Sequence, residues 1–416
     1  MSLTAEERQM LSPDANPAVA MAMRIVVETA RLMGARELVE ITGAHVDSCV
    51  YFSDAGVYFA ERLRDFGGKV AVPTSLNVGA LDLVNPDLIR AGAEQKAMAK
   101  RLMDACLDMG CQPSWTCAPY QAGFRPKPGE QIAWAESNAI VFANSILGAR
   151  TNRYGDYFDI CAALTGRAPK SGLHLDESRV ATLLIDVSHL PDPLLSEETF
   201  YPVLGTWLGR TVGSEIAAIE GIPEDVPEDW LKALAAASAS SGAVGLFHVI
   251  GVTPEAKTRD QAFDDRPPRS TLAPSVAELA AVRDSMSTTT AREIDSVALG
   301  SPHFSLDECR KLARLCEGRT FSKPVYVCTR YGVFDELGKT GEREKMQQAG
   351  VTFVIGTCVV VTPILRQASG VLMTNSGKFA HYSPSTVNHE VVFGSLEECV
   401  ASAEDGRVRR DGSLWN

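Results

Sequence analysis

Several polar and thiol side chains in the last third of the chain directly follow predicted β-strands. The strands are expected at 294–299, 325–328, 352–355 and 371–374, and the residues at or just beyond their ends are Ser301, His303, Cys328, Cys358, Ser376 and Lys378. In parallel α/β sheets, ligands bind beyond the carboxyl ends of the strands. The pattern therefore predicts one shared cleft, lined by hydroxyl, imidazole, thiol and ammonium groups.

A second set of reactive side chains lies in the first 153 residues. Segment 41–51 follows a predicted strand and carries His45, Asp47, Ser48 and Cys49, and the loop 73–80 carries Asn77. Glu136 and Ser137 lie at the start of an apolar helix, where free backbone amides attract an anion. Arg150 and Arg153 follow that helix and suit bidentate binding of a carboxylate or phosphate. The alternative interpretation is that these segments are ordinary loops and that the two arginines only cap the C-terminal end of the helix.

The cysteines exclude local metal-binding motifs. The chain has 10 cysteines but no CxxC pair, so zinc-ribbon and ferredoxin spacings are absent from the sequence. In a reducing compartment each cysteine is a core residue, a reactive thiol or a metal ligand. Any metal site must then be assembled from distant cysteines, and Cys117, in a loop without helical or strand periodicity, is one candidate.

Composition narrows the class of protein. The 416 residues carry 40 basic and 52 acidic side chains, a formal charge of −12, which argues against binding to a nucleic-acid backbone. No apolar run reaches the roughly 20 residues that cross a bilayer, and the polar N-terminus lacks the pattern of a secretory signal. We expect a cytoplasmic protein that does not enter membranes.

The elements that must position these side chains alternate between strand and helix. Capping boxes at Thr4–Glu7 and Ser305–Glu308 predict helix starts. Strands are expected at 37–42, 69–72, 182–187 and 243–250, helices at 16–34, 56–66, 88–109, 130–147 and 229–239, and a loop at 257–268. From about residue 291 the alternation is clearest, which is typical of a parallel sheet covered by helices, an α/β fold.

Six strings in the chain resemble the aconitase X family, large-subunit portion. They are TSLNVGALDL, WAESNAIVFANSILGARTNR, SSGAVGLFHVIGVTPEA, ALGSPHFS, GTC and TNSGKFAHY, in the order that the family has them. The resemblance spans about residues 4–410. It implies an aconitase-like α/β fold with three lobes of mostly parallel sheet around a central cleft, which we place at 1–165, 166–290 and 291–416. A swivelling fourth domain is expected on a separate small subunit.

The resemblance also implies an iron–sulfur dehydratase. The family contains cis-3-hydroxy-L-proline dehydratases and (R)-5-phosphomevalonate dehydratases. The resemblance implies metal ligands at Cys117, Ser301 and Cys358, but the phosphomevalonate pattern has cysteine where this chain has Ser301. A hydroxyl is a poor ligand for a soft metal site. Ser301 therefore argues against a cubane held by three cysteines. The resemblance to the hydroxyproline branch implies a 2Fe-2S cluster, which we favour over 3Fe-4S or 4Fe-4S, and Cys328 is a further possible sulfur donor.

The same resemblance implies substrate contacts at one set of positions. These are Asp47, Ser48, Cys49, Asn77, Val78, Glu136, Ser137 and Lys378. Asp47 and Cys49 depart from the phosphomevalonate pattern, which favours the hydroxyproline substrate. Lys378 and helix-terminal amides suit the charge that develops during β-elimination, and Arg150 and His303 are further substrate contacts. The base is left open among His45, Asp47, Ser376 and His303.

Three hypotheses follow from the sequence. The favoured one is the large subunit of a cis-3-hydroxy-L-proline dehydratase that forms Δ1-pyrroline-2-carboxylate. The alternatives are a phosphomevalonate dehydratase large subunit and a cluster-bearing subunit without catalysis of its own. An α/β hydrolase is disfavoured because no GxSxG motif is present.

Overall fold

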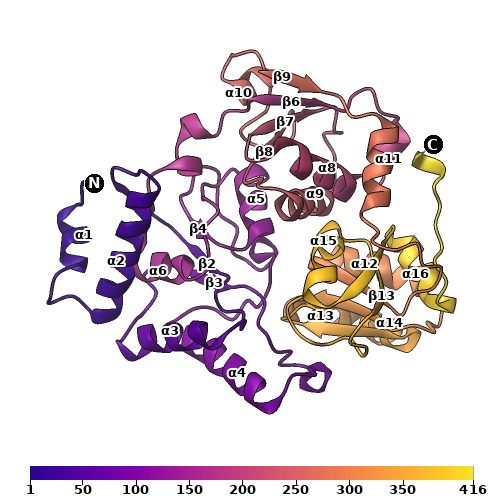
Figure 1. The fold of residues 1–416 in the computed structure, drawn as a ribbon, viewed down its shortest axis with the longest axis horizontal. Helices are drawn as coiled ribbons and strands as arrows, with labels where there is room; N and C mark the ends of the chain where they lie inside the picture. The colour runs from indigo at the N-terminus through magenta and orange to yellow at the C-terminus, as the bar shows by residue number, and fades with distance from the viewer. Residues whose placement is uncertain (416) are drawn as a thin grey trace. The chain divides into compact units, whose positions relative to one another are not determined.

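The computed structural model describes residues 1–415, which form two compact units (Figure 1). The first unit comprises Met1–Leu81, Ala91–Val180 and the short segment Thr253–Glu255. The second comprises Asp82–Arg90, Ala181–Val252 and the described chain from Ala256 onward. The predicted boundaries of three lobes, at 165/166 and 290/291, stay a prediction.

The first unit places helices around two small sheets. Its helices are α1 (Ala5–Met10), α2 (Pro17–Leu32), α3 (Asp54–Asp65), α4 (Ala93–Asp108), α5 (Ser137–Ser145) and α6 (Phe158–Thr165), with 3-10 turns η2 (Pro119–Gln121), η3 (Gly172–His174) and η4 (Asp176–Ser178). Its strands are β1 (Leu38–Glu40), β2 (Ala44–Val46), β3 (Thr74–Leu76), β4 (Ala133–Trp134) and β5 (Arg167–Pro169). Strands β3, β2 and β4 form a parallel sheet in that order, and β1 pairs with β5 antiparallel.

Local signals explain the start of the first unit. Thr4 and Glu7 form the expected capping box of α1, and Asn16 accepts hydrogen bonds from the first amides of α2, whose Pro17 needs no partner. The apolar face of α2, including Met23 and Val26, is buried in a core shared with α6 and the β2 sheet. This core fixes the sheet whose strand ends carry the candidate site.

The middle part of the second unit is a four-stranded parallel sheet. Its strands β6 (Leu183–Asp186), β7 (Ala217–Glu220), β8 (Phe247–Val249) and β9 (Ser270–Leu272) are ordered β8-β7-β6-β9. Its helices are α7 (Asp192–Leu195), α8 (Phe200–Val212), α9 (Glu228–Ser241), α10 (Arg259–Phe263) and α11 (Val276–Ser285). Helices α8 and α9 approach closely at Gly205, where a Cβ atom would lie 2.4 Å from the Leu234 carbonyl oxygen.

The C-terminal part of the second unit is a five-stranded parallel sheet. Its strands are β10 (Ser296–Phe304), β11 (Val325–Thr329), β12 (Val351–Ile355), β13 (Gly370–Thr374) and β14 (His389–Phe393), and its helices are α12 (Leu306–Leu315), α13 (Tyr331–Thr340), α14 (Glu342–Ala349), α15 (Gly377–Thr386) and α16 (Leu396–Asp405). The strands are parallel and ordered β12-β11-β10-β13-β14. The chain adds β11 and β12 on one side of β10 and then adds β13 and β14 on the other side, so the strand order reverses between β10 and β13. Such a reversal is where α/β sheets bind ligands. The 3-10 turns η1 (Pro86–Leu88) and η5 (Ser413–Trp415) complete the unit.

The predicted α/β class with mostly parallel strands is confirmed, but three local predictions are wrong. Residues 69–72 form no strand, because the amides of Val70 and Ala71 donate to the carbonyls of Met109 and Ala163 instead of to a ladder. The predicted helix 130–147 is divided into β4 and α5, since the side chain of Glu136 caps α5. The predicted loop 257–268 contains α10, capped by Thr258.

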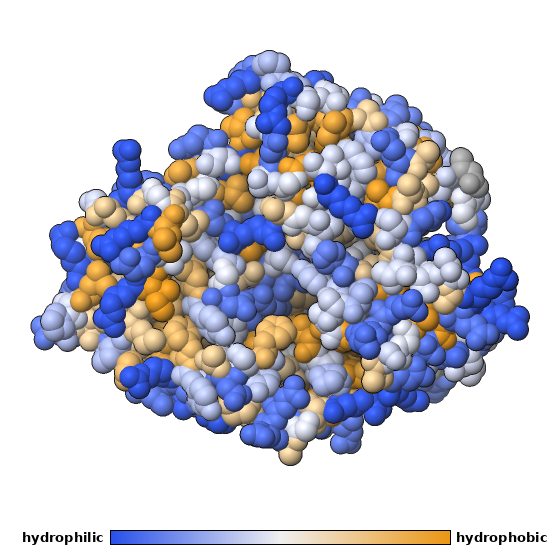
Figure 2. Space-filling model, viewed as in Figure 1, coloured by the Kyte–Doolittle hydropathy of each residue, from blue (hydrophilic) through white to orange (hydrophobic). Residues whose placement is uncertain are grey.

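Polar and apolar side chains are mixed on the face shown in Figure 2, where blue groups alternate with white and orange ones. Among residues 1–415, none of the helices combines the length and apolar character needed to cross a bilayer.

Candidate active site

The turn after β2 is the best-defined part of the first unit's site. The backbone amides of Asp47 and Ser48 donate to Asp159 Oδ2 at 2.6 and 2.9 Å, and Ser48 Oγ donates to Asp159 Oδ1 at 2.8 Å. Asp159, in α6, is fully buried. The strand that leads to this turn is β2, which holds His45, and not the strand predicted at 37–42.

Asn77 joins two of the predicted substrate contacts. Its side-chain nitrogen donates to Glu136 Oε2 at 2.9 Å and also to Asp47 Oδ1. Its own Oδ1 is buried without a hydrogen-bond partner. Glu136 reaches this position because it is the N-cap of α5, where its Oε1 accepts the Asn138 amide at 3.4 Å and the Ser137 hydroxyl at 3.5 Å. The structure therefore brings Asp47, Asn77 and Glu136 together.

This group brings several acidic side chains together. Burial, reinforced by Glu136 and Asp156, raises the pKa of Asp47 well above its ordinary value. Burial likewise raises the pKa of Asp159 to about 6, although hydrogen bonds from Ser48 oppose the shift. A carboxyl group with a raised pKa in such a site is suited to proton transfer near neutral pH.

His45 is a neutral, fully buried side chain. Its Nδ1 lies 2.8 Å from Ser75 Oγ, and its Nε2 has no hydrogen-bond partner. Burial lowers the pKa of His45 to about 3, so the imidazole is uncharged at neutral pH. Its ring lies 5.7 Å from that of Trp134 on the neighbouring strand.

Cys49 and Val78 are packed into the same region. The Cys49 thiol donates to the Val46 carbonyl at 3.2 Å, and burial raises its pKa well above the ordinary value. Val78 is 3% exposed and also directs its carbonyl towards Cys49 Sγ, at 3.8 Å. Cys49 is therefore a protonated thiol that donates to main-chain oxygen atoms.

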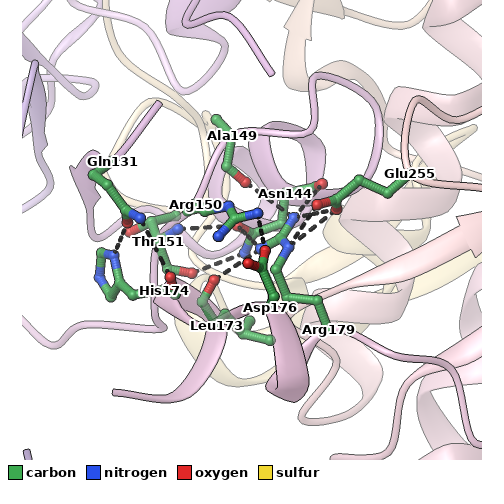
Figure 3. Close-up of polar contacts among 10 residues, drawn as sticks. All are labelled: Gln131, Asn144, Ala149, Arg150, Thr151, Leu173, His174, Asp176, Arg179 and Glu255. Carbon is green, nitrogen blue, oxygen red and sulfur yellow. Dashed lines mark hydrogen bonds and ion pairs between the residues drawn. The ribbon is translucent and has the colours of Figure 1, made fainter. Parts of the chain in front are cut away.

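Arg150 and a residue that the sequence reasoning missed, Arg179, belong to a different network (Figure 3). Arg150 pairs with the exposed Asp176, away from the contacts of Asn77. Arg179 is 4% exposed and pairs with Glu255 at 2.6 Å. It also donates to the carbonyls of Asn144 and Ala149 at 3.0 and 3.1 Å, so it satisfies oxygens at the end of α5.

Strand ends of the second unit meet at the reversal between β10 and β13. Ser376 Oγ donates to the Ser301 carbonyl and accepts the Phe379 amide at 3.0 Å as the N-cap of α15. His303 Nε2 lies 3.0 Å from the Thr357 carbonyl. A cavity of about 30 Å³ lies here, lined by Ser301, Ser376, Lys232 and neighbouring residues. Hydrogen bonds therefore connect Ser301 with Ser376 and His303 with Thr357, and Lys378 lies in the first turn of α15, while a cleft shared with Cys358 and Lys378 stays a prediction.

A buried ion-paired lysine borders that cavity. Lys232 of α9 lies 2.8 Å from Asp229 and also pairs with Glu308 of α12. Burial alone would lower the pKa of Lys232, but Glu308 and Asp229 raise it above its ordinary value. Sequence reasoning missed it, although a lysine within the apolar run DWLKALAAASA was the available signal. Asp159 is similarly placed in the apolar run FDICAALT.

The cysteines proposed as metal ligands differ in their surroundings. Cys117 and Cys358 are each 6% exposed and lie in loops, whereas Cys328 is fully buried within β11. Asn138 fixes the Cys117 loop by donating to its carbonyl at 2.8 Å. Two loop thiols suit an iron–sulfur cluster in donor type, and the Ser301 hydroxyl does not. Within residues 1–415, three His, Cys, Asp or Glu side chains do not come together as a metal-binding group.

Comparison with known proteins places the whole chain in one family. Family models described as aconitase X first, second and third domain match residues 1–177, 181–284 and 294–405. A cis-3-hydroxy-L-proline dehydratase of Pseudomonas aeruginosa is 43% identical over 99% of this chain and 72% of that protein. A protein of the same name from Hypocrea jecorina is 41% identical over 98% of this chain and 69% of that protein.

More distant relatives agree. A phosphomevalonate dehydratase large subunit of Methanosarcina mazei is 34% identical over 99% of both chains. The crystal structure of Thermococcus kodakaraensis aconitase X in its holo-form has a TM-score of 0.87 and 32% identity, and the match covers 97% of this chain and 100% of that one. The chain belongs to the aconitase X family.

Proposed function

We propose that this chain is the large subunit of a hydro-lyase that converts cis-3-hydroxy-L-proline to Δ1-pyrroline-2-carboxylate and water. The observation that carries the proposal is the 43% and 41% identity with two hydroxyproline dehydratases over nearly the whole chain, against 34% for the phosphomevalonate enzyme. The reaction breaks the C2–H and C3–O bonds. The resulting enamine takes a proton at C3 and loses one from nitrogen to become the imine.

The chemistry of the first unit's site supports this substrate. Glu136, Asp156 and Asp159 each raise the pKa of Asp47 electrostatically, so four acidic side chains meet in this region. Such a group attracts the secondary ammonium of an amino acid and repels a phosphate. We propose Asp47 as the base that takes the C2 proton, since its raised pKa matches the task better than that of the neutral His45.

We propose that Cys117 and Cys358 hold an iron–sulfur cluster, with 2Fe-2S favoured. For a further ligand we favour Cys328 over Ser301, because a hydroxyl is a poorer donor to this kind of metal site than a thiolate. When bound by these residues, an iron–sulfur cluster would supply Lewis-acid chemistry for departure of the hydroxyl group. On this chain, Lys378 is proposed to stabilise the charge that develops on the substrate carboxylate, and Ser137 and the amides at the start of α5 to orient the substrate.

We propose that a small subunit completes the enzyme in the cytoplasm. The phosphomevalonate relatives that match this chain over 95–99% of their length are named large subunits. The hydroxyproline relatives are longer, since the match covers 72% and 69% of them. The ten buried cysteines suit a reducing compartment.

Steady-state kinetics of anaerobically purified protein, co-produced with the small subunit, tests this proposal. Turnover of cis-3-hydroxy-L-proline, with phosphomevalonate unchanged, is expected. Turnover of phosphomevalonate alone would overturn the substrate assignment. A pure, iron-loaded complex that acts on neither compound would favour the subunit without catalysis.

A further inference from the structure

Asp159 has an unusual set of hydrogen bonds for a buried carboxylate. Its Oδ2 accepts the amides of Asp47 and Ser48 at 2.6 and 2.9 Å. Its Oδ1 accepts the Ser48 hydroxyl at 2.8 Å and the Ile160 amide at 2.7 Å. Three of these four donors belong to one turn, which lies 111 and 112 residues earlier in the chain. The carboxylate therefore holds the Asp47–Ser48 turn from outside it.

The hydrogen bond from the Ser48 hydroxyl to Asp159 determines how Ser48 can bind a ligand. A serine hydroxyl has one hydrogen and two lone pairs. Because the hydrogen of Ser48 is donated to Asp159, only lone pairs remain for another partner. The adjacent Asp47 side chain, when ionised, is also an acceptor. The turn therefore presents hydrogen-bond acceptors and fits a ligand group that brings N–H donors.

We propose that Asp159 is a positioning residue that makes Ser48 an obligate hydrogen-bond acceptor for the secondary ammonium of the substrate. The proposal rests on the proposed function, because cis-3-hydroxy-L-proline supplies that ammonium with its two N–H donors. A phosphate has oxygens that act as acceptors at neutral pH, so its lone pairs would face those of Ser48 and Asp47 and be repelled. Asp159 thereby contributes to the selection of an amino acid over a phosphorylated substrate without touching it.

The arrangement requires an ionised Asp159. Burial raises the pKa of this carboxyl to about 6, so it is ionised at neutral pH and can accept all four bonds. The titratable groups that interact with it electrostatically are Asp47, Asp156, Cys49, Cys106, Cys111 and Cys161. None of these is a cation, so the amide and hydroxyl donors are what stabilises the charge.

D159N tests the proposal because it changes one acceptor atom into a donor. If the side-chain amide oxygen introduced by D159N keeps the hydrogen bonds from the backbone amides of Asp47 and Ser48, its NH2 group faces Ser48 Oγ. The Ser48 hydroxyl then accepts from this NH2 group, and its own hydrogen is free to point towards the ligand. Dissociation constants are measured by calorimetry for two compounds on the anaerobic complex. One is cis-3-hydroxy-L-proline, and the other is cis-3-hydroxytetrahydrofuran-2-carboxylate, in which an oxygen acceptor replaces the ammonium.

The wild-type complex is expected to prefer the pyrrolidine by at least about tenfold, and D159N to reduce that ratio at least about fivefold. S48A should reduce it similarly, and S48A/D159N no further, because both residues act through one hydrogen bond. D65N, which changes an exposed acid at the end of α3, should leave the ratio within about twofold. If D159N does not fold, as judged by circular dichroism, S48A carries the test alone.

An unchanged ratio in folded D159N or in S48A would overturn the proposal even if the wild type dehydrates hydroxyproline. A wild-type complex that fails to turn over hydroxyproline would instead overturn the proposed function. The binding ratio and the turnover therefore report separately.

Discussion

Asn77 and Glu136, 59 residues apart in sequence, are joined by a 2.9 Å hydrogen bond from the amide nitrogen to Oε2. The same nitrogen donates to Asp47, so one amide group separates two carboxylates. Like charges at this range repel strongly in a buried site. Asn77 therefore sets the geometry of both acids, which come from the turn after β2 and from the start of α5.

Replacing Asn77 should damage catalysis more than folding. We expect N77A to lower kcat/KM for cis-3-hydroxy-L-proline by on the order of 10²-fold, because the two carboxylates lose their common donor and move apart. N77D adds a third acid and should be more severe. Steady-state kinetics and thermal unfolding of both variants provide the check. If N77A is largely unfolded at the assay temperature, so that unfolding explains its loss of activity, the assignment is contradicted.

The raised pKa of Asp159 predicts how the free energy of unfolding changes with pH. In the folded protein this pKa is about 6, against 3.8 for the free side chain, so between these values the folded state holds more protons than the unfolded state. The contribution of Asp159 to stability therefore falls as pH rises from about 4 to about 6. Urea unfolding of wild type and D159N should show the difference moving in favour of D159N over this range. A difference that moves in the opposite direction would refute it.

The ion pairs of Lys232 should matter more than those on the surface. K232M leaves the carboxylates of Asp229 and Glu308 without their cation, and breaking a buried pair in this way costs about 3–5 kcal/mol. K311M, which removes the partner of Glu198 and Glu397 at a partly exposed site, should cost about 1 kcal/mol or less. Chemical denaturation of the two variants gives the comparison, and equal costs would count against the buried triad.

Arg179 and Arg150 offer a similar contrast within the first unit. R179A removes the donors to the Asn144 and Ala149 carbonyls and unpairs Glu255, so we expect a loss of about 3 kcal/mol or more. R150A removes a pair with an exposed acid and should cost about 1 kcal/mol or less. Hydrogen exchange at the amides of α5 is the direct measurement. Protection of α5 that survives in R179A would contradict the stabilising role.

Local chemistry made part of this architecture predictable. The capping boxes at Thr4 and Ser305 and the alternation after residue 291 correctly indicated helix starts and a parallel sheet. The strand predicted at 69–72 was wrong because the amides of Val70 and Ala71 donate to carbonyls at the C-terminal ends of α4 and α6, and no local sequence pattern indicates such distant partners.

The site residues that directly follow strands could be predicted from the sequence. Those that lie in or beside helices and bind partners far away in the sequence could not. Ser301 and Ser376 meet because β10 and β13 flank the reversal of strand order. Asp159, Arg179 and Lys232 were missed, since each lies within or beside a helix and reaches partners that the fold brings close. A charged residue within an apolar run is the signal that deserved more weight.

Iron and sulfide analysis of the anaerobically purified protein tests most directly the proposal that Cys117 and Cys358 hold an iron–sulfur cluster. We expect about two iron and two sulfide per wild-type chain, the content of a 2Fe-2S cluster. C117S and C358S should each lose most of both, while C399S, which changes a residue on the buried face of α16, should retain them. Wild-type protein without iron, or C117S and C358S with undiminished iron, would contradict the account.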